Sequence, residues 1–178
     1  MKLSGLAVAL ATAWVGAGAR AAVVDAQPSG FQVQETVEIA APAPRVWAAL
    51  GRIGAWWDSE HTWSHDAKHL SLDLTPDGCL CETLPNGGGV RHMSVIFLAP
   101  GKSAILEGTL GPLVFSGAAG HLVWTLAETG GHTTLTQSYY VGGYFPGGLD
   151  KLAPAVDGVL TQQVTRLKAY VETGKPAG

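Results

Sequence analysis

The chain has 178 residues, of which 14% are charged and 47% are hydrophobic, and its formal net charge at pH 7 is -3. These values are typical of a globular domain with few surface charges and not of a disordered chain. Lys and Arg form no run anywhere in the sequence. This excludes the clustered basic surface that binding to nucleic acids or to anionic membranes requires.

The first residues have the features of a secretory signal peptide. Lys2 precedes an apolar stretch over 3–15, and small residues follow it. A positive start, a short apolar core and a small-x-small end are the parts of such a signal. The stretch is shorter than the ~20 residues that span a bilayer, which favours cleavage over an uncleaved anchor helix. Cleavage is expected after Ala21, or after Ala19 as a second choice. Residues 1–21 are thus the predicted signal peptide, and the mature protein is expected to be periplasmic or secreted without a stable membrane anchor.

The next segments predict a strand followed by two short helices. Residues 22–30 are expected to form a short flexible lead. The apolar residues of 31–39 alternate, as they do in a strand with one buried face. Two prolines then end this strand and open a helix, in which apolar residues recur at helical spacing up to position 50. A second short turn of helix is expected at 55–57.

The remaining chain predicts a series of strands and one long helix. The strand-like segments are roughly 70–74, 79–84, 90–98, 103–110, 121–127 and 133–142. Their short connections, rich in Gly and Pro, favour antiparallel neighbours. A helix over 149–171 carries apolar residues at close to 3.6-residue spacing, and Pro154 is expected to start or kink it. Residues 173–178 are expected to be a disordered tail.

Two hairpins can be registered from their turns, and each register separates an apolar face from a polar one. If Gly130-Gly131 centres the later hairpin, its inner face contains Leu122, Trp124, Leu126, Leu135, Gln137, Tyr139 and Val141. If Pro100-Gly101 centres the earlier one, its apolar face contains Met93, Val95, Phe97, Ala104, Leu106, Gly108 and Leu110. His92, Ser94, Glu107 and Thr109 are then expected on the outer face. The inner face carries no charge in this register.

Several segments resemble the SRPBCC superfamily of START and Bet v 1-related domains, in its small exported bacterial branch. They are Val37-Glu38-Ile39, 41–47, Trp56-Trp57, 61–64, Leu106-Glu107-Gly108, 110–113, Trp124-Thr125-Leu126 and 160–167. Their order and spacing carry the resemblance, which covers about 31–172. It implies an α+β helix-grip fold, a curved antiparallel sheet of about seven strands wrapped on the long C-terminal helix. It also implies two short helices after the first strand and a cavity between sheet and helix.

Cys79 and Cys81 are two positions apart in a predicted strand. Side chains at that spacing point to one face, which is unfavourable for a mutual disulfide. A metal site would need further ligands at suitable spacing. Two small, buried and unlinked cysteines are therefore expected.

Histidines and tryptophans gather between the short helices and the next strand. His61, His65 and His69 recur at a spacing of four, which on a helix could bind a metal. The segment has the composition of a loop, so a polar rim to the cavity is the favoured interpretation and no metal is predicted. Trp57 and Trp63 are expected nearest the opening, with ordinary core packing as the alternative.

No convincing catalytic constellation is found. Glu107 with His92 or Glu82 could form an acid/base set, but the register places Glu107 and His92 on the solvated face. No nucleophile motif occurs, the glycine-rich pieces are turns, and no cofactor is predicted.

Three functions are compatible with the resemblance, whose members bind lipids and hormones, cyclise polyketides or activate a chaperone ATPase. The first is an exported protein that binds a small apolar or aromatic molecule, because the predicted inner face is apolar and uncharged. The second is a polyketide cyclase or dehydratase-like enzyme that uses the same cavity. The third, a chaperone-ATPase-activator-like module, fits an exported protein least. The predicted ligand-binding residues are Trp57, His61, Trp63, Met93, Val95, Phe97, Leu106, Leu122, Trp124, Leu126, Gln137 and Tyr139.

Gln137 is the one amide on the inner faces of the two registered hairpins. A buried amide left unpaired costs roughly 1–3 kcal/mol, so a partner is expected. The candidates are the Tyr139 hydroxyl, a trapped water, or the carbonyl or hydroxyl of a bound ligand.

Overall fold

A computed structural model of the chain describes residues 20–178. The α-helices are α1 (Ala43–Leu50) and α2 (Ala153–Thr173), and the strands are β1 (Arg20–Gln27), β2 (Gly30–Ile39), β3 (Leu70–Leu72), β4 (Cys79–Thr83), β5 (Gly89–Ala99), β6 (Ser103–Gly108), β7 (Gly117–Thr129) and β8 (His132–Tyr144). Short 3-10 helices are η1 (Ile53–Ala55), η2 (Ser59–His61), η3 (Ala67–His69), η4 (Pro85–Gly87) and η5 (Gly111–Phe115). Most of the predicted signal peptide lies outside the described residues.

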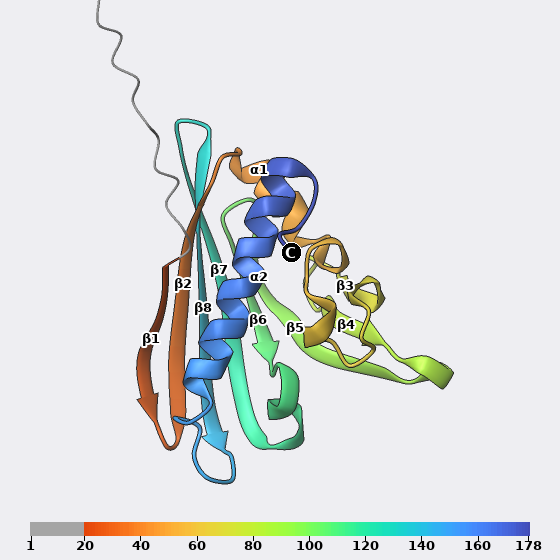
Figure 1. The fold of residues 1–178 in the computed structure, drawn as a ribbon, viewed down its shortest axis with the longest axis vertical. Coiled ribbons are helices and arrows are strands. Elements are labelled where there is room, and N and C mark those ends of the chain that lie inside the picture. The colour runs from red at the N-terminus through yellow and green to blue at the C-terminus, as the bar shows by residue number, and fades with distance from the viewer. Residues whose placement is uncertain (1–19) are drawn as a thin grey trace, which may run out of the picture.

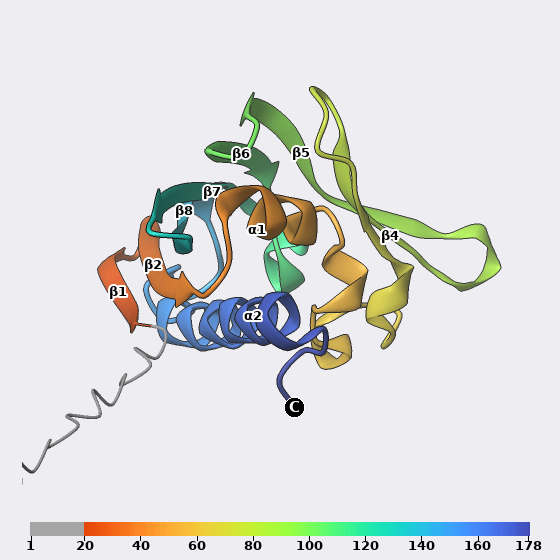
Figure 2. The same cartoon turned by 90° about the horizontal axis from the view of Figure 1, so that it is seen from above.

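The eight strands form one antiparallel sheet in the order β1-β2-β8-β7-β6-β5-β4-β3. The sheet curves, and α2 runs along its concave side (Figure 1). Seen from above, the strands bend around α2 on one side and extend past it to the β4–β5 hairpin on the other (Figure 2). The predicted helix-grip architecture is therefore confirmed, with one strand more than expected.

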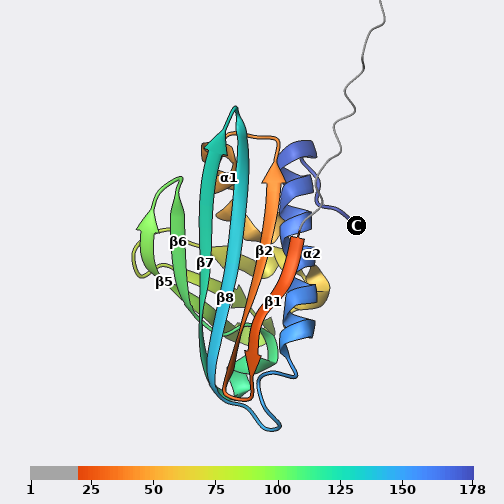
Figure 3. The ribbon, with the colours of Figure 1, turned by 90° about the vertical axis from the view of Figure 1, so that its left-hand side faces the viewer.

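The additional strand is β1, which corrects the expectation of a flexible lead over 22–30. It pairs antiparallel with β2, with Val23 opposite Val33 and a bulge at the next residue. It lies at the edge of the sheet beside α2 (Figure 3). The sequence did not reveal this strand because Val23 and Val24 are both exposed, so it lacks the alternation that marks a half-buried strand.

A proline marks the beginning of the C-terminal helix, and a glycine marks its end. Pro154 occupies its first turn, where a missing backbone N–H costs nothing, as the sequence indicated. Gly174 caps it in the left-handed conformation. Beyond the cap, Arg166 donates a hydrogen bond to the carbonyl of Ala177, so the expected disordered tail is instead held against α2.

The predicted register of the later hairpin is confirmed. Gly130 and Gly131 both have positive φ angles, as a tight two-residue turn requires. Trp124 lies opposite Gln137, and Leu122 lies opposite Tyr139. All four side chains are buried.

The predicted faces of the earlier hairpin are correct for Met93, Val95, Ala104 and Leu106, which are buried, but not for all of β5, because β5 contains two bulges. His92 is the extra residue between the pairs Leu80–Met93 and Cys81–Arg91, and Ile96 is the extra residue opposite β6. Each bulge reverses the alternation of side chains. Phe97, predicted inside, is therefore 50% exposed, whereas His92 and Thr109, predicted outside, are buried. Glu107 is exposed as expected.

Cys79 and Cys81 form a disulfide, so the expectation of unlinked cysteines is wrong. Their Cα atoms are 5.4 Å apart, within the range that a disulfide accepts. A regular strand would separate them by about 6.6 Å, so β4 is contracted here. The contraction lies opposite the β5 bulge at His92, which sequence alternation does not reveal.

Candidate functional site

A cavity of about 470 Å³ lies between α2, the β3–β5 end of the sheet and the loops that join them. Its lining is mostly apolar. The residues are Ile53, Trp57, Glu60, His61, Thr62, Trp63, His65, Leu70, Leu80, His92, Leu110, Gly111, Pro112, Leu113, Tyr139, Leu152, Ala155, Val156, Val159 and Leu160. The helix contributes one flank of its apolar stripe, and η5 with the loop around η2 forms the opposite side.

Two aromatic rings meet at the edge of the cavity. Trp63 comes from the loop after η2, and Phe115 comes from η5. Their ring centroids are 5.4 Å apart with an edge-to-face geometry. Trp63 is 38% exposed and Phe115 is 80% exposed, so the pair lies where the cavity meets solvent. Such a contact contributes about 0.5–1.5 kcal/mol and joins the two sides of the opening.

The loop that carries Trp57 and His61 is fastened to α2 by hydrogen bonds. The backbone N–H of Asp58 donates to Gln163 Oε1 over 2.9 Å. His61 Nε2 lies 3.1 Å from Gln162 Oε1, and the Trp57 indole N–H donates to the His61 carbonyl over 3.0 Å. These hydrogen bonds hold the loop with Trp57 and His61 in place as one wall of the cavity.

Tyr139 contributes a hydroxyl to the cavity. Its oxygen accepts a hydrogen bond from the Leu110 N–H over 3.2 Å, and burial raises the pKa of the Tyr139 hydroxyl above its ordinary value. The group is therefore neutral at physiological pH and can donate its proton to an acceptor in the cavity.

His92 and Glu82 form a buried pair at the cavity wall. Glu82 Oε2 and His92 Nε2 are 3.0 Å apart, and the two residues are 2% and 7% exposed. The Ser64 backbone N–H donates to the other carboxylate oxygen. Burial acts to raise the pKa of Glu82, but the hydrogen bonds from Ser64, His92 and Trp63 outweigh it and lower the pKa. Glu82 is thus an anion that orients the ring of His92.

Backbone hydrogen bonds place the His92 carbonyl and the Tyr139 hydroxyl beside two consecutive residues, Thr109 and Leu110. The N–H of Thr109 donates to the His92 carbonyl over 3.0 Å, and the N–H of the next residue, Leu110, donates to the Tyr139 hydroxyl. The predicted register had His92 on the outer face, so its position at the cavity wall was not expected. The β5 bulge turns it inward, and no composition signal marks that bulge.

A second set of buried polar side chains lies on the neighbouring strands β7, β8 and β2. The Trp124 indole N–H donates to Gln137 Oε1 over 2.7 Å, and Gln137 Nε2 donates to Glu35 Oε2 over 3.0 Å. The Tyr139 hydroxyl is not the partner of Gln137, contrary to one of the expected alternatives. Glu35 is fully buried, so the expectation of an uncharged inner face is wrong. The alternation of 31–39 could have revealed it, because Glu35 falls in register with Val33 and Val37.

The predicted binding residues divide into three groups. Four of them line the cavity, namely Trp57, His61, Trp63 and Tyr139. Seven are buried in the core without lining it, namely Met93, Val95, Leu106, Leu122, Trp124, Leu126 and Gln137. Phe97 lies on the outer face. The core residues face the correct side of the sheet, but α2 and neighbouring side chains fill the space above them.

The histidines predicted to form a polar rim partly do so. His61 and His65 line the cavity, whereas His69 lies in η3. Within residues 20–178, no three His, Cys, Asp or Glu side chains are grouped as a metal site. None of the helices in that range is long and apolar enough to cross a membrane.

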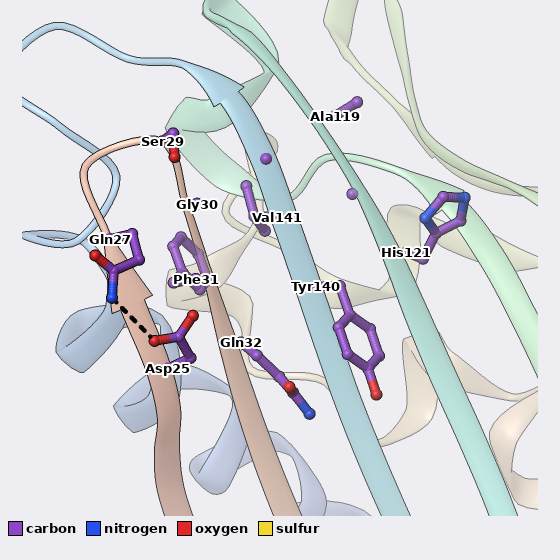
Figure 4. Close-up of a pocket in the computed structure, with 12 residues that line it drawn as sticks. Asp25, Gln27, Ser29, Gly30, Phe31, Gln32, Ala119, His121, Tyr140 and Val141 are labelled. Carbon is purple, nitrogen blue, oxygen red and sulfur yellow. Dashed lines mark hydrogen bonds between the residues drawn. The ribbon is translucent and has the colours of Figure 1, made fainter.

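A second hollow, a shallow groove of about 520 Å³, lies across the ends of β1, β2, β8 and β7 (Figure 4). Exposed polar side chains border it, among them His121, Tyr140 and Asp25, which accepts a hydrogen bond from Gln27 over 3.2 Å. It lacks the enclosing apolar walls of the cavity under α2, which is therefore the candidate site.

Solved structures share this fold. A conserved protein of unknown function from Enterococcus faecalis is 18% identical with a TM-score of 0.58, over 85% of this chain and 77% of that one. DynU16, from the dynemicin biosynthetic locus, is 24% identical with a TM-score of 0.58, over 82% of this chain and 48% of its own. The Aha1 dimer from Colwellia psychrerythraea is 16% identical with a TM-score of 0.57, over 81% of this chain and 98% of that one. These identities establish the fold alone.

The sequence itself identifies the family. No curated protein matches the chain. Residues 30–172 match the family described as polyketide cyclase / dehydrase and lipid transport, which is of the SRPBCC type. The match spans the sheet from β2 onwards and nearly all of α2. The chain therefore belongs to the polyketide cyclase / dehydrase and lipid transport family.

Proposed function

We propose that this protein binds a small, mostly apolar molecule in the cavity under α2. The observation that carries the proposal is the cavity itself, whose volume of about 470 Å³ and apolar walls are those of small-molecule sites. The family supports binding of small hydrophobic ligands or cyclase-like activity.

The polar groups of the cavity favour a ligand with one polar end. Tyr139 offers a hydroxyl donor, and His92 offers an imidazole that ionised Glu82 orients. Both residues line the cavity, so the polar end of a ligand can form a hydrogen bond with either of them. A carbonyl or hydroxyl group of a ligand would give these buried groups a hydrogen-bond partner.

We also propose that the protein is exported. The support comes from the signal-like features of residues 1–21 and from the Cys79–Cys81 disulfide, since disulfides persist in oxidising compartments. Cleavage after Ala21 would leave residues 22–27 of β1 to pair with β2. N-terminal sequencing of periplasmic or secreted material should begin at Ala22, or at Arg20 for the second site. A cytosolic product that retains Met1 would contradict export.

Binding can be tested with an apolar fluorescent probe and a variant that fills the cavity. Ala155 lines the cavity yet is exposed, so Ala155→Trp should preserve the fold and block the space. Thr165→Trp, an exposed position on the same helix outside the cavity lining, is the matched control. Probe binding should fall at least tenfold in Ala155→Trp and stay unchanged in the control. Equal binding by all three proteins would show that the probe binds elsewhere.

A second candidate function, cyclase-like catalysis, is favoured by the buried Glu82–His92 pair. An imidazole held by a carboxylate at a cavity wall can accept a proton from a carbon next to a carbonyl, with the Tyr139 hydroxyl bonded to the carbonyl oxygen. A bound aryl methyl ketone should then exchange its methyl protons with deuterium from solvent, and His92→Gln should abolish the acceleration. Exchange at the buffer rate with the parent protein would argue for binding without catalysis.

A further inference from the structure

The Cys79–Cys81 disulfide lies on the outer face of β4, behind the polar wall of the cavity. Both cysteines are half-buried, whereas Leu80 and Glu82, which alternate with them, are buried on the inner face. Leu80 lines the cavity, and Glu82 contacts His92, which also lines it. A reductant can therefore reach the disulfide from solvent without entering the cavity.

The disulfide requires this part of β4 to be short. The Cα atoms of Cys79 and Cys81 are 5.4 Å apart, whereas two residues of a regular strand span about 6.6 Å. Without the bond, the segment can therefore lengthen by about 1.2 Å.

The two ends of this segment are held differently. Before it, the Gly78 carbonyl accepts a hydrogen bond from the Val95 N–H over 2.7 Å, and the Cys79 carbonyl accepts one from the Asp73 N–H over 3.2 Å. After it, β4 pairs with the three residues of β3 and continues into the exposed end of the β4–β5 hairpin (Figure 2). Lengthening is therefore directed towards Glu82.

His92 is held by β6 and not by β4. It is the extra residue of the β5 bulge, and the pairing of β4 with β5 passes over it. Its carbonyl accepts a hydrogen bond from the Thr109 N–H over 3.0 Å. Gly108, with a φ of 150°, leaves room for this carbonyl, because a Cβ at that position would collide with it. The position of His92 therefore does not follow β4 when that strand lengthens.

The contact between Glu82 and His92 depends on the length of β4 for this reason. Glu82 Oε2 and His92 Nε2 are 3.0 Å apart. Hydrogen bonds from N–H to oxygen span ~2.7–3.2 Å, so a shift of Glu82 by about 1.2 Å weakens or breaks the contact.

We propose that the Cys79–Cys81 disulfide is a redox switch that controls the contact of Glu82 with His92. A dithiol, either a small molecule or a protein, supplies two electrons and two protons. The S–S bond breaks, two cysteine thiols form, and the dithiol becomes a disulfide. Glu82 then withdraws from His92, whose ring loses the carboxylate that orients it.

The bond is suited to reversible reduction under native conditions. It is accessible from the outer face, and it closes a loop with a single residue between the cysteines. A short loop stabilises the fold less than a long one, so reduction should leave the rest of the sheet intact. The consequence for a ligand rests on the proposed binding function, in which His92 bonds the polar end of the ligand.

The switch can be tested on the parent chain without a ligand. Because Glu82 is ionised, His92 Nε2 carries the proton of their hydrogen bond. NMR of protein labelled with ¹⁵N-histidine should therefore show a slowly exchanging ring N–H in the oxidised state. Reduction by a dithiol should speed its exchange with solvent at least about tenfold, while the amide signals of β7 and β8 stay in place. The exposed ring of His121 is the internal reference. An unchanged His92 signal in the reduced protein would overturn the proposal.

A double variant separates the disulfide from other effects of the reductant. Cys79→Ala with Cys81→Ala should resemble the reduced parent and should not respond to the dithiol. Ser94→Ala, which replaces the β5 partner of Cys79, is the matched control and should switch like the parent. A response of the double variant to the dithiol would also overturn the proposal, since the change would then arise elsewhere.

A separate measurement tests the link to the cavity. Reduction should weaken the binding of an apolar fluorescent probe that ends in a carbonyl group at least about tenfold in the parent and not in the double variant. If NMR shows the switch but the probe binds in neither state, the proposed binding function fails and the switch stands. If the probe binds equally in both states while the contact of Glu82 with His92 is lost, the coupling to the ligand is refuted.

Discussion

Replacing Gln137 by Leu is the sharpest test of the polar network inside the sheet. The substitution removes the acceptor of the Trp124 indole N–H and the donor to Glu35 Oε2, in a fully enclosed position. Each buried group left without its partner costs about 1–3 kcal/mol, so we expect a loss of about 2–6 kcal/mol in the free energy of unfolding at pH 8. If Gln137 had no partner among the protein side chains, the same change would be nearly neutral.

The loss should also depend on pH. Gln137 stabilises the ionised form of Glu35, and Glu35 titrates with a pKa of about 7. Below that pH the Glu35 carboxyl is protonated, and removal of the Gln137 donor costs less stabilisation. The destabilisation should therefore be smaller at pH 5.5 than at pH 8. Urea denaturation followed by circular dichroism at both pH values measures the difference.

Gln34→Leu is the matched control for this measurement. Gln34 lies on β2 with its side chain on the outer face, where it donates to Ser138 over 3.0 Å in a half-buried position. Its replacement should cost no more than about 1 kcal/mol at either pH. If the free energy of unfolding of Gln137→Leu at pH 8 were within about 1 kcal/mol of the parent value, the hydrogen bonds of Gln137 to Trp124 and Glu35 would not stabilise the fold as argued.

Three further predictions follow from single contacts. The native protein should contain no free thiol before reduction and two after it, because Cys79 and Cys81 are linked; two reactive thiols in the oxidised protein would contradict the pairing. Glu82→Gln should destabilise the protein at neutral pH. Because the folded-state pKa of Glu82 is lowered from 4.5, the deficit should shrink as the pH falls below that value, and acid titration showing a constant deficit would argue against an ionised Glu82. Phe115→Ala should cost no more than about 1.5 kcal/mol of stability, because the ring is 80% exposed and loses only its edge-to-face contact, but it should speed the exchange of a cavity probe; unchanged stopped-flow rates would show that the Trp63–Phe115 contact does not limit access.

Features set by local chemistry could be predicted from the sequence. Gly130 and Gly131 adopt the positive φ angles of a tight turn, which fixes the register of β7 and β8 and places Trp124 opposite Gln137. Pro154 marks the start of α2, and the helical period of the segment determines its buried face. Trp57 and Trp63, which the sequence predicted as ligand-binding residues, both line the cavity, and their part in binding stays a prediction.

Features set by contacts between distant residues could not be predicted in the same way. Periodicity assumes an uninterrupted strand, so the two bulges of β5 reversed the expected positions of His92 and Phe97. The partner of Gln137 is Glu35, which lies 102 positions away in the chain, and only pairing of β2 with β8 brings them together.

The sequence by itself determined that this chain forms a curved antiparallel sheet with a long helix across it, because alternation, turns and helix ends are local signals. The tertiary structure alone decided where the cavity lies and which polar groups reach it. It also buried Glu35 of β2 beside Gln137 of β8, since burial and the pKa of a carboxyl depend on whatever the fold packs beside it.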